Sequence, residues 1–310
     1  MTRRTLLQVA PALLAAAPAK HIVLVSGDEE YRSEELLPQL AKILSRRHGF
    51  RTTVLFAIDK TDGTVNPQQN DNIPGLEALD SAHLLVLHTR YRDLPDHQMR
   101  HIVNYVESGR PIFGLRTATH AFELKSSPTY ADYSSTRPDG GFGRRVLGET
   151  WIRHHGEHGK QSSLGVINPA QAKHPVLRGI RTGDLWSPTD VYETRLPLPG
   201  DSQTLVFGQV LAGMASSDPP VSGPVNNPMM PVVWTRHYRQ SRVVTTTFGT
   251  SAELLLPGMR RLYVNACYWA LGLDHRIHAK SNVDLVGDYK PLPFLAGGHA
   301  KGLKPEALTR

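Results

Sequence analysis

The sequence predicts an α/β fold built on a doubly wound, mainly parallel sheet. Short apolar runs of strand type alternate with segments whose apolar residues recur at helical spacing, which is typical of parallel βαβ units. The chain has 310 residues, of which 40% are hydrophobic, so it can bury one large core. Its net charge of +7 comes without a long run of lysine or arginine, so no nucleic-acid partner is expected.

The first residues predict an export leader. Arg3 and Arg4 precede an apolar run over residues 6–17, and Ala17-Pro18-Ala19 is a small-x-small cleavage site. We therefore expect residues 1–19 to be a signal peptide and the mature chain to be periplasmic or secreted. The paired arginines also resemble a twin-arginine motif, with an ordinary secretory leader as the alternative. No later segment reaches eighteen apolar residues, so no membrane anchor is expected.

The first half of the mature chain predicts four strands with helices between them. The predicted strands are apolar runs at residues 21–25, 53–58, 84–87 and 112–115. A helix after the first strand carries Leu36, Leu40 and Leu44 on one face and closes at His48-Gly49. Met99, Ile102 and Val106 mark a second helix before the fourth strand.

A sharp strand-to-helix turn is predicted after the fourth strand. Thr117 or Thr119 can cap a helix there. Such a turn exposes its first side chain, Arg116, at the carboxyl edge of the sheet, where the amino end of the helix also attracts anions. His120 follows one helical turn later.

The carboxyl ends of the strands carry the first set of candidate site residues. Ligands of open parallel sheets bind beyond these ends, so three polar loops should face one crevice. The loops carry Asp28, Glu29, Tyr31, His88, Arg90, Tyr91, Arg116, Thr117 and His120. Because charged and aromatic residues recur in all three, the pattern favours a site over ordinary polar strand ends.

A loop-rich insertion is predicted at about residues 125–165, where the apolar periodicity fades. It ends in a polar cluster that contains His154, His155 and His158. The glycines between and after these histidines exclude a zincin helix, so any metal would be held by a loop. Imidazole is a common metal ligand and a base near neutral pH. The cluster therefore predicts a divalent metal such as zinc, a role in proton transfer or substrate contact, or a solvated loop.

The rest of the chain predicts further strands, one helix and a tail. The strand candidates are residues 165–167, 205–210, 232–234 and 243–248. Trp186, Asp190 and Tyr192 lie close together in sequence, an arrangement that suits sugar recognition or a plain strand edge. Cys267, the single cysteine, lies in a predicted helix and is expected to be core packing, so no internal disulfide forms. Residues 276–310 should wrap the surface as an extended tail.

Taken as a set, these motifs resemble the trehalose-utilisation (ThuA-like) family, in its exported branch. The resemblance is carried by residues 21–27, 114–122, 151–159, 189–192, 245–249 and 260–266. It implies a flavodoxin-like fold of the class I glutamine amidotransferase type for a domain over residues 20–275. It also implies a link to disaccharide breakdown through keto-sugar intermediates and a histidine-rich site that holds a divalent metal in some members. No nucleotide cofactor is expected.

The sequence departs from this resemblance at two positions. Amidotransferases place a cysteine at the turn after the fourth strand, many members of the ThuA-like family place a histidine there, and this chain has Arg116. Gly249-Thr250-Ser251 stands where those relatives carry a late histidine. Amidotransferase chemistry by a cysteine nucleophile is therefore excluded. A metal site would depend on His154, His155 or His158.

The leading hypothesis is an exported lyase, isomerase or hydrolase that acts on a sugar or keto-sugar glycoside. Arg116 would hold a carbonyl or carboxylate oxygen, His120 would act as acid or base, and His155 and His158 would close over the substrate. The expected substrate-binding residues are Asp28, Glu29, Tyr31, His88, Arg90, Trp186, Asp190 and Tyr192. The alternative is a carbohydrate-binding or scaffold module without catalysis. A hydrolase using Thr117 or Ser126 is disfavoured because no G-x-S-x-G elbow is present.

Overall fold

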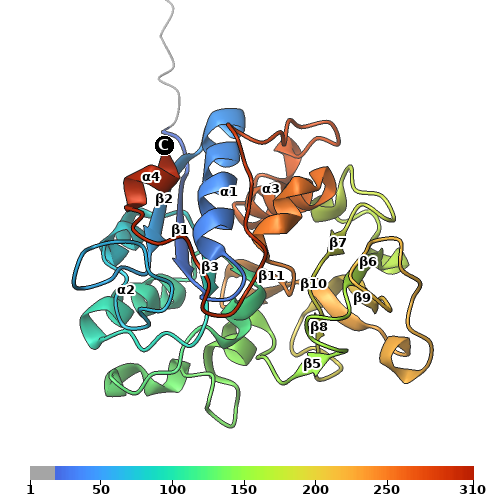
Figure 1. The fold of residues 1–310 in the computed structure, drawn as a ribbon, viewed down its shortest axis with the longest axis horizontal. Helices are drawn as coiled ribbons and strands as arrows, with labels where there is room; N and C mark the ends of the chain where they lie inside the picture. Colours follow the sequence, from blue (N-terminus) through green and yellow to red (C-terminus); the bar gives the residue numbers. More distant parts are fainter. Residues whose placement is uncertain (1–17) are drawn as a thin grey trace, which may run out of the picture.

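A nine-stranded sheet forms the centre of the molecule in the computed structural model, which describes residues 18–310. The strand order is β2-β1-β3-β4-β11-β10-β9-β6-β7 (Figure 1). The predicted α/β fold with a parallel central sheet is confirmed. Residues 1–17 of the predicted leader, which spans residues 1–19, lie outside the described part of the chain. Within residues 18–310, no helix combines the length and apolarity needed to cross a membrane.

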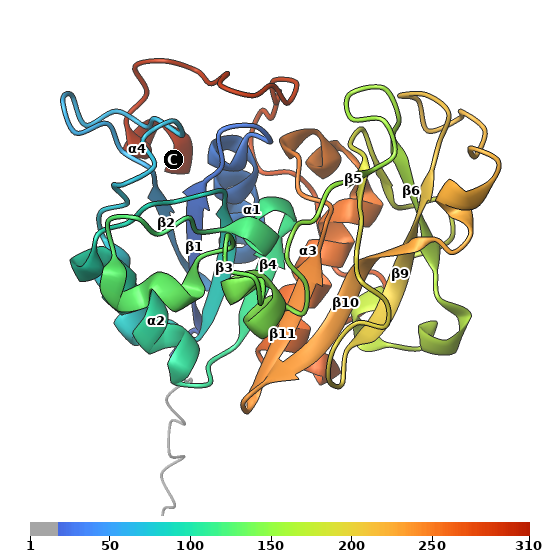
Figure 2. The same cartoon turned by 90° about the horizontal axis from the view of Figure 1, so that it is seen from below.

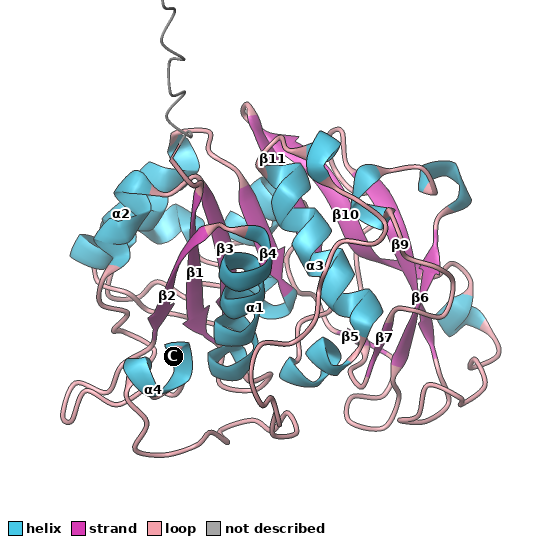
Figure 3. Ribbon diagram, turned by 90° about the horizontal axis from the view of Figure 1, so that it is seen from above, coloured by secondary structure: helices cyan, strands magenta, loops and turns pink. Residues whose placement is uncertain are grey.

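One half of the sheet is parallel and doubly wound. Its strands are β1 (His21–Gly27), β2 (Arg51–Phe56), β3 (Leu84–Thr89), β4 (Ile112–Leu115) and β11 (Ser241–Thr246). Helices α1 (Ser33–His48) and α3 (Pro257–Ala270) cover one face (Figure 3). Helix α2 (Asp96–Glu107) covers the other (Figure 2). Alternate residues of each strand enter two separate cores, because successive side chains point to opposite faces.

The other half of the sheet is antiparallel. Its strands are β10 (Met230–Tyr238), β9 (Gln203–Val210), β6 (Ser163–Ile167) and β7 (Trp186–Ser187). A separate two-stranded ribbon pairs β5 (His154–His155) with β8 (Val191–Tyr192). This ribbon joins the predicted histidine cluster to the segment that contains Asp190, two regions about 35 residues apart in sequence.

Two sequence-based expectations concern the helices near the sheet. The helix expected after β4 is only a 3₁₀ turn, Arg116–His120. The carbonyls of His120 and Ala121 accept hydrogen bonds from Tyr91 and Arg92, at 3.0 and 2.8 Å, so the chain runs beside the β3 loop instead of continuing as a helix. Cys267 is fully buried within α3, as expected, and burial raises the pKa of its thiol.

The ends of the parallel strands are aligned, which brings their loops together. Ser26 of β1 lies opposite Phe56 and His88, and Leu115 of β4 lies opposite Thr246 of β11. The loops after these strands therefore meet at one edge of the sheet. The C-terminal tail passes along α1 and ends in a short helix, α4 (Pro305–Thr309) (Figure 1).

Candidate functional site

Arg116 lies at the strand-to-turn junction after β4. Its φ of 40° places a non-glycine residue in the left-handed region, which marks a tight elbow. The guanidinium is fully buried between the rings of Tyr31 and Tyr192, at 4.1 and 4.4 Å from their centroids. Nη2 donates to Asp190 Oδ1 at 2.9 Å, and Nη1 donates to the carbonyl oxygen of Thr247 at 2.6 Å. Arg116 was expected to hold a substrate oxygen, but its terminal nitrogens instead hold Asp190 and the backbone.

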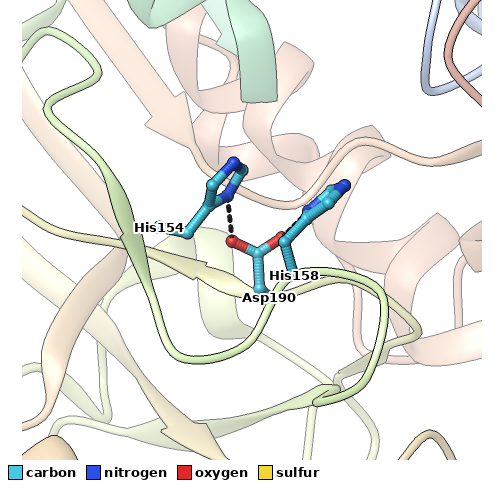
Figure 4. A group of neighbouring side chains, drawn as sticks. All are labelled: His154, His158 and Asp190. Carbon is cyan, nitrogen blue, oxygen red and sulfur yellow. Dashed lines mark hydrogen bonds and ion pairs between the residues drawn. The ribbon is translucent and has the colours of Figure 1, made fainter.

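Asp190 is the carboxylate around which two histidines gather. His154 Nδ1 donates to Asp190 Oδ2 at 2.6 Å, and His158 Nδ1 donates to Asp190 Oδ1 at 2.9 Å (Figure 4). Burial alone would raise the pKa of Asp190. The hydrogen bonds from both histidines and the Arg116 charge outweigh burial and hold the pKa of Asp190 well below its usual range. Asp190 is therefore ionised, and the histidines are oriented by it.

His158 links Asp190 to the β1–α1 loop. Its Nε2 lies 3.1 Å from Glu30 Oε1. The hydrogen bonds to Asp190 and then to Glu30 raise the pKa of His158 to about 9. For Glu30, burial acts to raise the pKa, but the His158 hydrogen bond and the charges of Arg90 and Arg116 lower it overall. Near neutral pH these groups form a charged chain from Glu30 through His158 to Asp190.

His155 faces away from this cluster. Because β5 is extended, neighbouring side chains point to opposite sides. His155 Nε2 lies 2.6 Å from the carbonyl oxygen of Val225, so its ring packs against the segment before β10. The three histidines that were expected to cluster therefore do not all lie together. Asp190 is the third member of the cluster with His154 and His158, and His155 is not part of it.

A cavity of about 80 Å³ opens beside the cluster. It is lined by Glu30, Tyr31, Arg90, Tyr91, His120, Trp151, His154 and Tyr192. The His120 ring lies 4.8 Å from Tyr91 and 5.5 Å from Trp151, measured between ring centroids. Burial, followed by the charges of Arg90 and Arg116, lowers the pKa of His120 well below its ordinary value. His120 is therefore a neutral imidazole at the wall of an aromatic pocket.

The β1–α1 loop is tied to the elbow by Asp28. This carboxylate is fully buried, and its Oδ2 accepts a hydrogen bond from Thr117 Oγ1 at 2.7 Å. Its Oδ1 accepts from the backbone N–H of Glu30 at 2.9 Å. Glu29 pairs with Arg92 at 2.7 Å and also with Arg90. Asp28 and Glu29 thus shape the loop, while Glu30, Tyr31 and Arg90 reach the cavity.

Two predicted substrate-binding residues lie elsewhere. His88 is fully buried behind the elbow, and burial lowers its pKa to about 4. Trp186 lies on the edge strand β7, where its indole nitrogen donates to Ser162 Oγ at 3.2 Å. Neither residue lines the cavity, in which Trp151 supplies the indole ring.

Sequence reasoning missed three residues of the site. Glu30 and Trp151 lie inside segments that the sequence analysis had singled out. The carboxylate of Glu30 and the indole ring of Trp151 could have marked them as site residues. Phe294 comes from the C-terminal tail and stacks on Tyr31 with ring centroids 5.4 Å apart. No feature of the tail sequence indicated that contact.

The donor set of His154, His158 and Asp190 suits a divalent cation. One ligand atom from each side chain can be chosen so that all three lie within 4.8 Å of one another. Two imidazoles and one carboxylate are a common ligand set for zinc and for iron. A cation held there would replace the hydrogen bonds between the histidines and Asp190, while Arg116 would remain bonded to the carboxylate.

The fold and the site together define an α/β protein with a mainly parallel central sheet, whose elbow after β4 carries Arg116 and no cysteine. The sequence matches the ThuA family, described as trehalose utilisation, over residues 22–270. The chain therefore belongs to the ThuA family, and membership implies a role in the utilisation of trehalose or other sugars. A search of curated proteins finds no match.

A solved structure with a TM-score above 0.5 supports the assignment of the fold. A putative ThuA-like protein from Parabacteroides merdae is 16% identical, with a TM-score of 0.52 over 90% of this chain and 96% of that chain. A cytoplasmic protein from Salmonella typhimurium is 11% identical, with a TM-score of 0.45 over 80% of this chain and 98% of that chain. At these identities the likeness concerns the fold alone.

Proposed function

We propose that this protein is an enzyme that acts on a sugar or keto-sugar glycoside by acid–base chemistry, without a cysteine nucleophile. The observation that carries the proposal is His154, which lines an aromatic pocket while its Nδ1 is held by the ionised Asp190. A histidine fixed by a carboxylate through one ring nitrogen presents the other as a base. The sugar-related family supports a carbohydrate as the substrate.

The pocket supplies the groups that removal of a proton next to a ketone requires. His154 would take the proton, the electron pair of the broken C–H bond would form a C=C bond, and the π pair of the carbonyl group would move onto the ketone oxygen to give an enolate. Arg90 lines the same cavity and carries the charge that stabilises such an oxyanion. His120, a neutral imidazole that lines the same cavity, would accept or return a proton at a neighbouring oxygen.

The walls of the pocket suit a sugar ring. Tyr91, Trp151 and Tyr192 offer ring faces for the apolar C–H side of a pyranose, and Glu30 can accept hydrogen bonds from hydroxyl groups. Arg116 takes a supporting role in this proposal, because it positions Asp190 from within the protein.

A divalent cation such as zinc gives a second form of the same proposal. His154, His158 and Asp190 would hold it, and when bound it would act as a Lewis acid towards a substrate oxygen. In that form His154 is a ligand, and His120 remains as the base.

The adjacent histidines of β5 provide the test. We expect His154→Gln and His120→Ala each to lower turnover of a keto-disaccharide at least a hundredfold, the usual range for a lost acid or base. His155→Gln is the matched control, because its ring faces Val225 and should leave turnover within about twofold of wild type. Equal losses in His154→Gln and His155→Gln would contradict the proposal.

A non-catalytic carbohydrate-binding module is the second candidate. The specific observation in its favour is Arg116, a buried arginine at the position of the elbow residue. Calorimetry with trehalose and with its keto derivatives, with and without added Zn²⁺, separates the two candidates. Binding of these sugars without turnover in any condition would favour the module.

We also infer export of the mature chain to the periplasm or outside the cell. The basis is the leader, in which Arg3 and Arg4 precede the apolar run and the small-x-small site. Replacement of both arginines by lysine should block export if the twin-arginine route is used. Undiminished export of the double variant would indicate an ordinary secretory leader instead.

A further inference from the structure

The C-terminal tail crosses the loop of residues 28–31, which shapes the pocket. We call residues 289–298 of this tail the strap. Backbone N–H groups of Leu295 and Gly297 donate to carbonyl oxygens of this loop at 2.9 and 3.0 Å. Arg32 Nε donates to a strap carbonyl at 2.9 Å. The strap is thus fixed by main-chain contacts to the segment that carries Glu30 and Tyr31.

Phe294 is the strap residue next to the site. Its ring stacks on Tyr31, with centroids 5.4 Å apart and planes inclined by 26°. It also lies 6.1 Å from the ring of His158. The Arg116 guanidinium lies 4.1 Å from the centroid of the same Tyr31 ring. Phe294 therefore stacks on a residue that lines the cavity, although it does not line the cavity itself.

The strap presents apolar side chains to solvent on both sides of Phe294. Leu292 is 43% exposed and Leu295 is 63% exposed. Within residues 18–310 they are two of the four large apolar side chains that are at least 43% exposed. Exposed apolar groups gathered on one segment are typical of a surface that contacts a ligand.

The size of the pocket requires that a larger substrate extend beyond it. Its volume is about 80 Å³. Pockets that enclose a small-molecule ligand usually measure about 300–1,000 Å³, so this cavity is too small to enclose a whole disaccharide. The remainder of a disaccharide or other glycoside must lie over the rim.

We infer that the strap forms a second part of the substrate site, in which Phe294 is the platform for the second unit of a glycoside. This inference rests on the proposed function and specifies its substrate class as glycosides, in preference to free monosaccharides. The family match ends at residue 270, so this selectivity comes from a segment that follows the family domain. Stacking of a sugar face on one aromatic ring accounts for a preference of up to about tenfold.

The test compares binding of trehalose and glucose by calorimetry, in the full mature chain. Phe294→Ala should weaken trehalose binding about five- to tenfold and leave glucose binding unchanged, whereas Phe294→Tyr should restore the preference for trehalose. Lys290→Ala is the matched strap control, because its side chain is 84% exposed and pairs with Asp288. Melting temperatures of all variants show whether the fold is retained.

The outcomes separate this inference from the proposed function. Equal weakening of both sugars by Phe294→Ala, or no weakening of either, would overturn the strap as a second part of the site and leave the pocket proposal in place. If the wild type bound neither these sugars nor their keto derivatives, the proposed function would fail and the inference with it.

Discussion

Asp190 connects the chemistry of the site to the stability of the core. Its carboxylate accepts hydrogen bonds from two histidines, one of which lines the cavity, and from the buried Arg116 guanidinium. Both members of the Asp190–Arg116 pair are shielded from water. Removal of one charge from such a pair leaves the other uncompensated.

We predict that Asp190→Asn lowers the free energy of unfolding by about 3 kcal/mol, because Arg116 would remain buried without its counter-ion. Urea unfolding followed by circular dichroism measures this loss. His154→Gln serves as the control, since it removes a partly exposed hydrogen-bond partner of the same carboxylate and should cost less than about 1 kcal/mol. Similar losses in the two variants would argue against a structural role for the Asp190–Arg116 pair.

We further predict that metal binding depends on His154 and does not depend on His155, its neighbour in β5. Calorimetric titration with Zn²⁺ should give one site in the wild type and in His155→Gln. His154→Gln should weaken that site at least tenfold, because one of the three donors is lost. Retained affinity in His154→Gln, or loss in His155→Gln, would exclude the predicted ligand set.

Individual site residues were only partly predictable from the sequence. His154 and His158 stood out because several histidines and glycines occur within a few residues. His155 points away from them because β5 pairs with β8, and the spacing of residues along the chain does not reveal this pairing. Arg116 was correctly placed at the elbow, but its burial between Tyr31 and Tyr192 results from tertiary packing.

At the scale of elements, the elbow depends on a close approach between β4 and β11. Gly249 follows β11, and a Cβ atom there would lie 2.7 Å from Arg116 Cβ. No side-chain rotation can relieve that contact, because both atoms are fixed by the backbone.

We predict that Gly249→Ala destabilises the protein by about 2 kcal/mol through this clash. It should also weaken sugar binding, since displacement of Arg116 moves Asp190. Urea unfolding and calorimetry measure the two effects. Gly287→Ala is the comparison, because its added methyl group meets no atom within 4 Å and tests the backbone cost alone. Equal stability of Gly249→Ala and wild type would show that the elbow tolerates a wider separation.

The strands of the parallel half were predictable because each is a short apolar run that ends in polar residues. The predicted helix after β4 was wrong in extent. Capping residues were present, but the backbone N–H groups of Tyr91 and Arg92 donate to carbonyl groups that a longer helix would use. A tertiary contact between two loops therefore overrode the local preference for a longer helix.

For the whole molecule, the tail and α1 enclose a carboxyl group whose ionisation opposes folding. Glu34 is 4% exposed, and neither of its side-chain oxygens has a hydrogen-bond partner. It lines a cavity together with Tyr289 and Lys290 of the tail, and Arg32 Nη1 lies 3.9 Å from its Oε1. Burial raises the pKa of Glu34 to about 8 from its ordinary value of 4.5.

This shift predicts how stability depends on pH. Between pH 4.5 and pH 8 the folded protein keeps a proton on Glu34 that the unfolded chain has lost. The folded state is therefore favoured at low pH, and the Glu34 contribution falls by about 1.4 kcal/mol for each pH unit as the pH rises through this window.

Glu34→Gln should remove this part of the pH dependence, because glutamine fills the same space and does not ionise. Urea unfolding of both proteins at pH 6 and pH 8 gives the comparison: the wild type should lose more stability than the variant over this interval. Glu306→Gln, on the exposed side of α4, should follow the wild type. Parallel losses in wild type and Glu34→Gln would mean that the tail does not keep Glu34 protonated, and that the contact between tail and α1 is looser than its burial indicates.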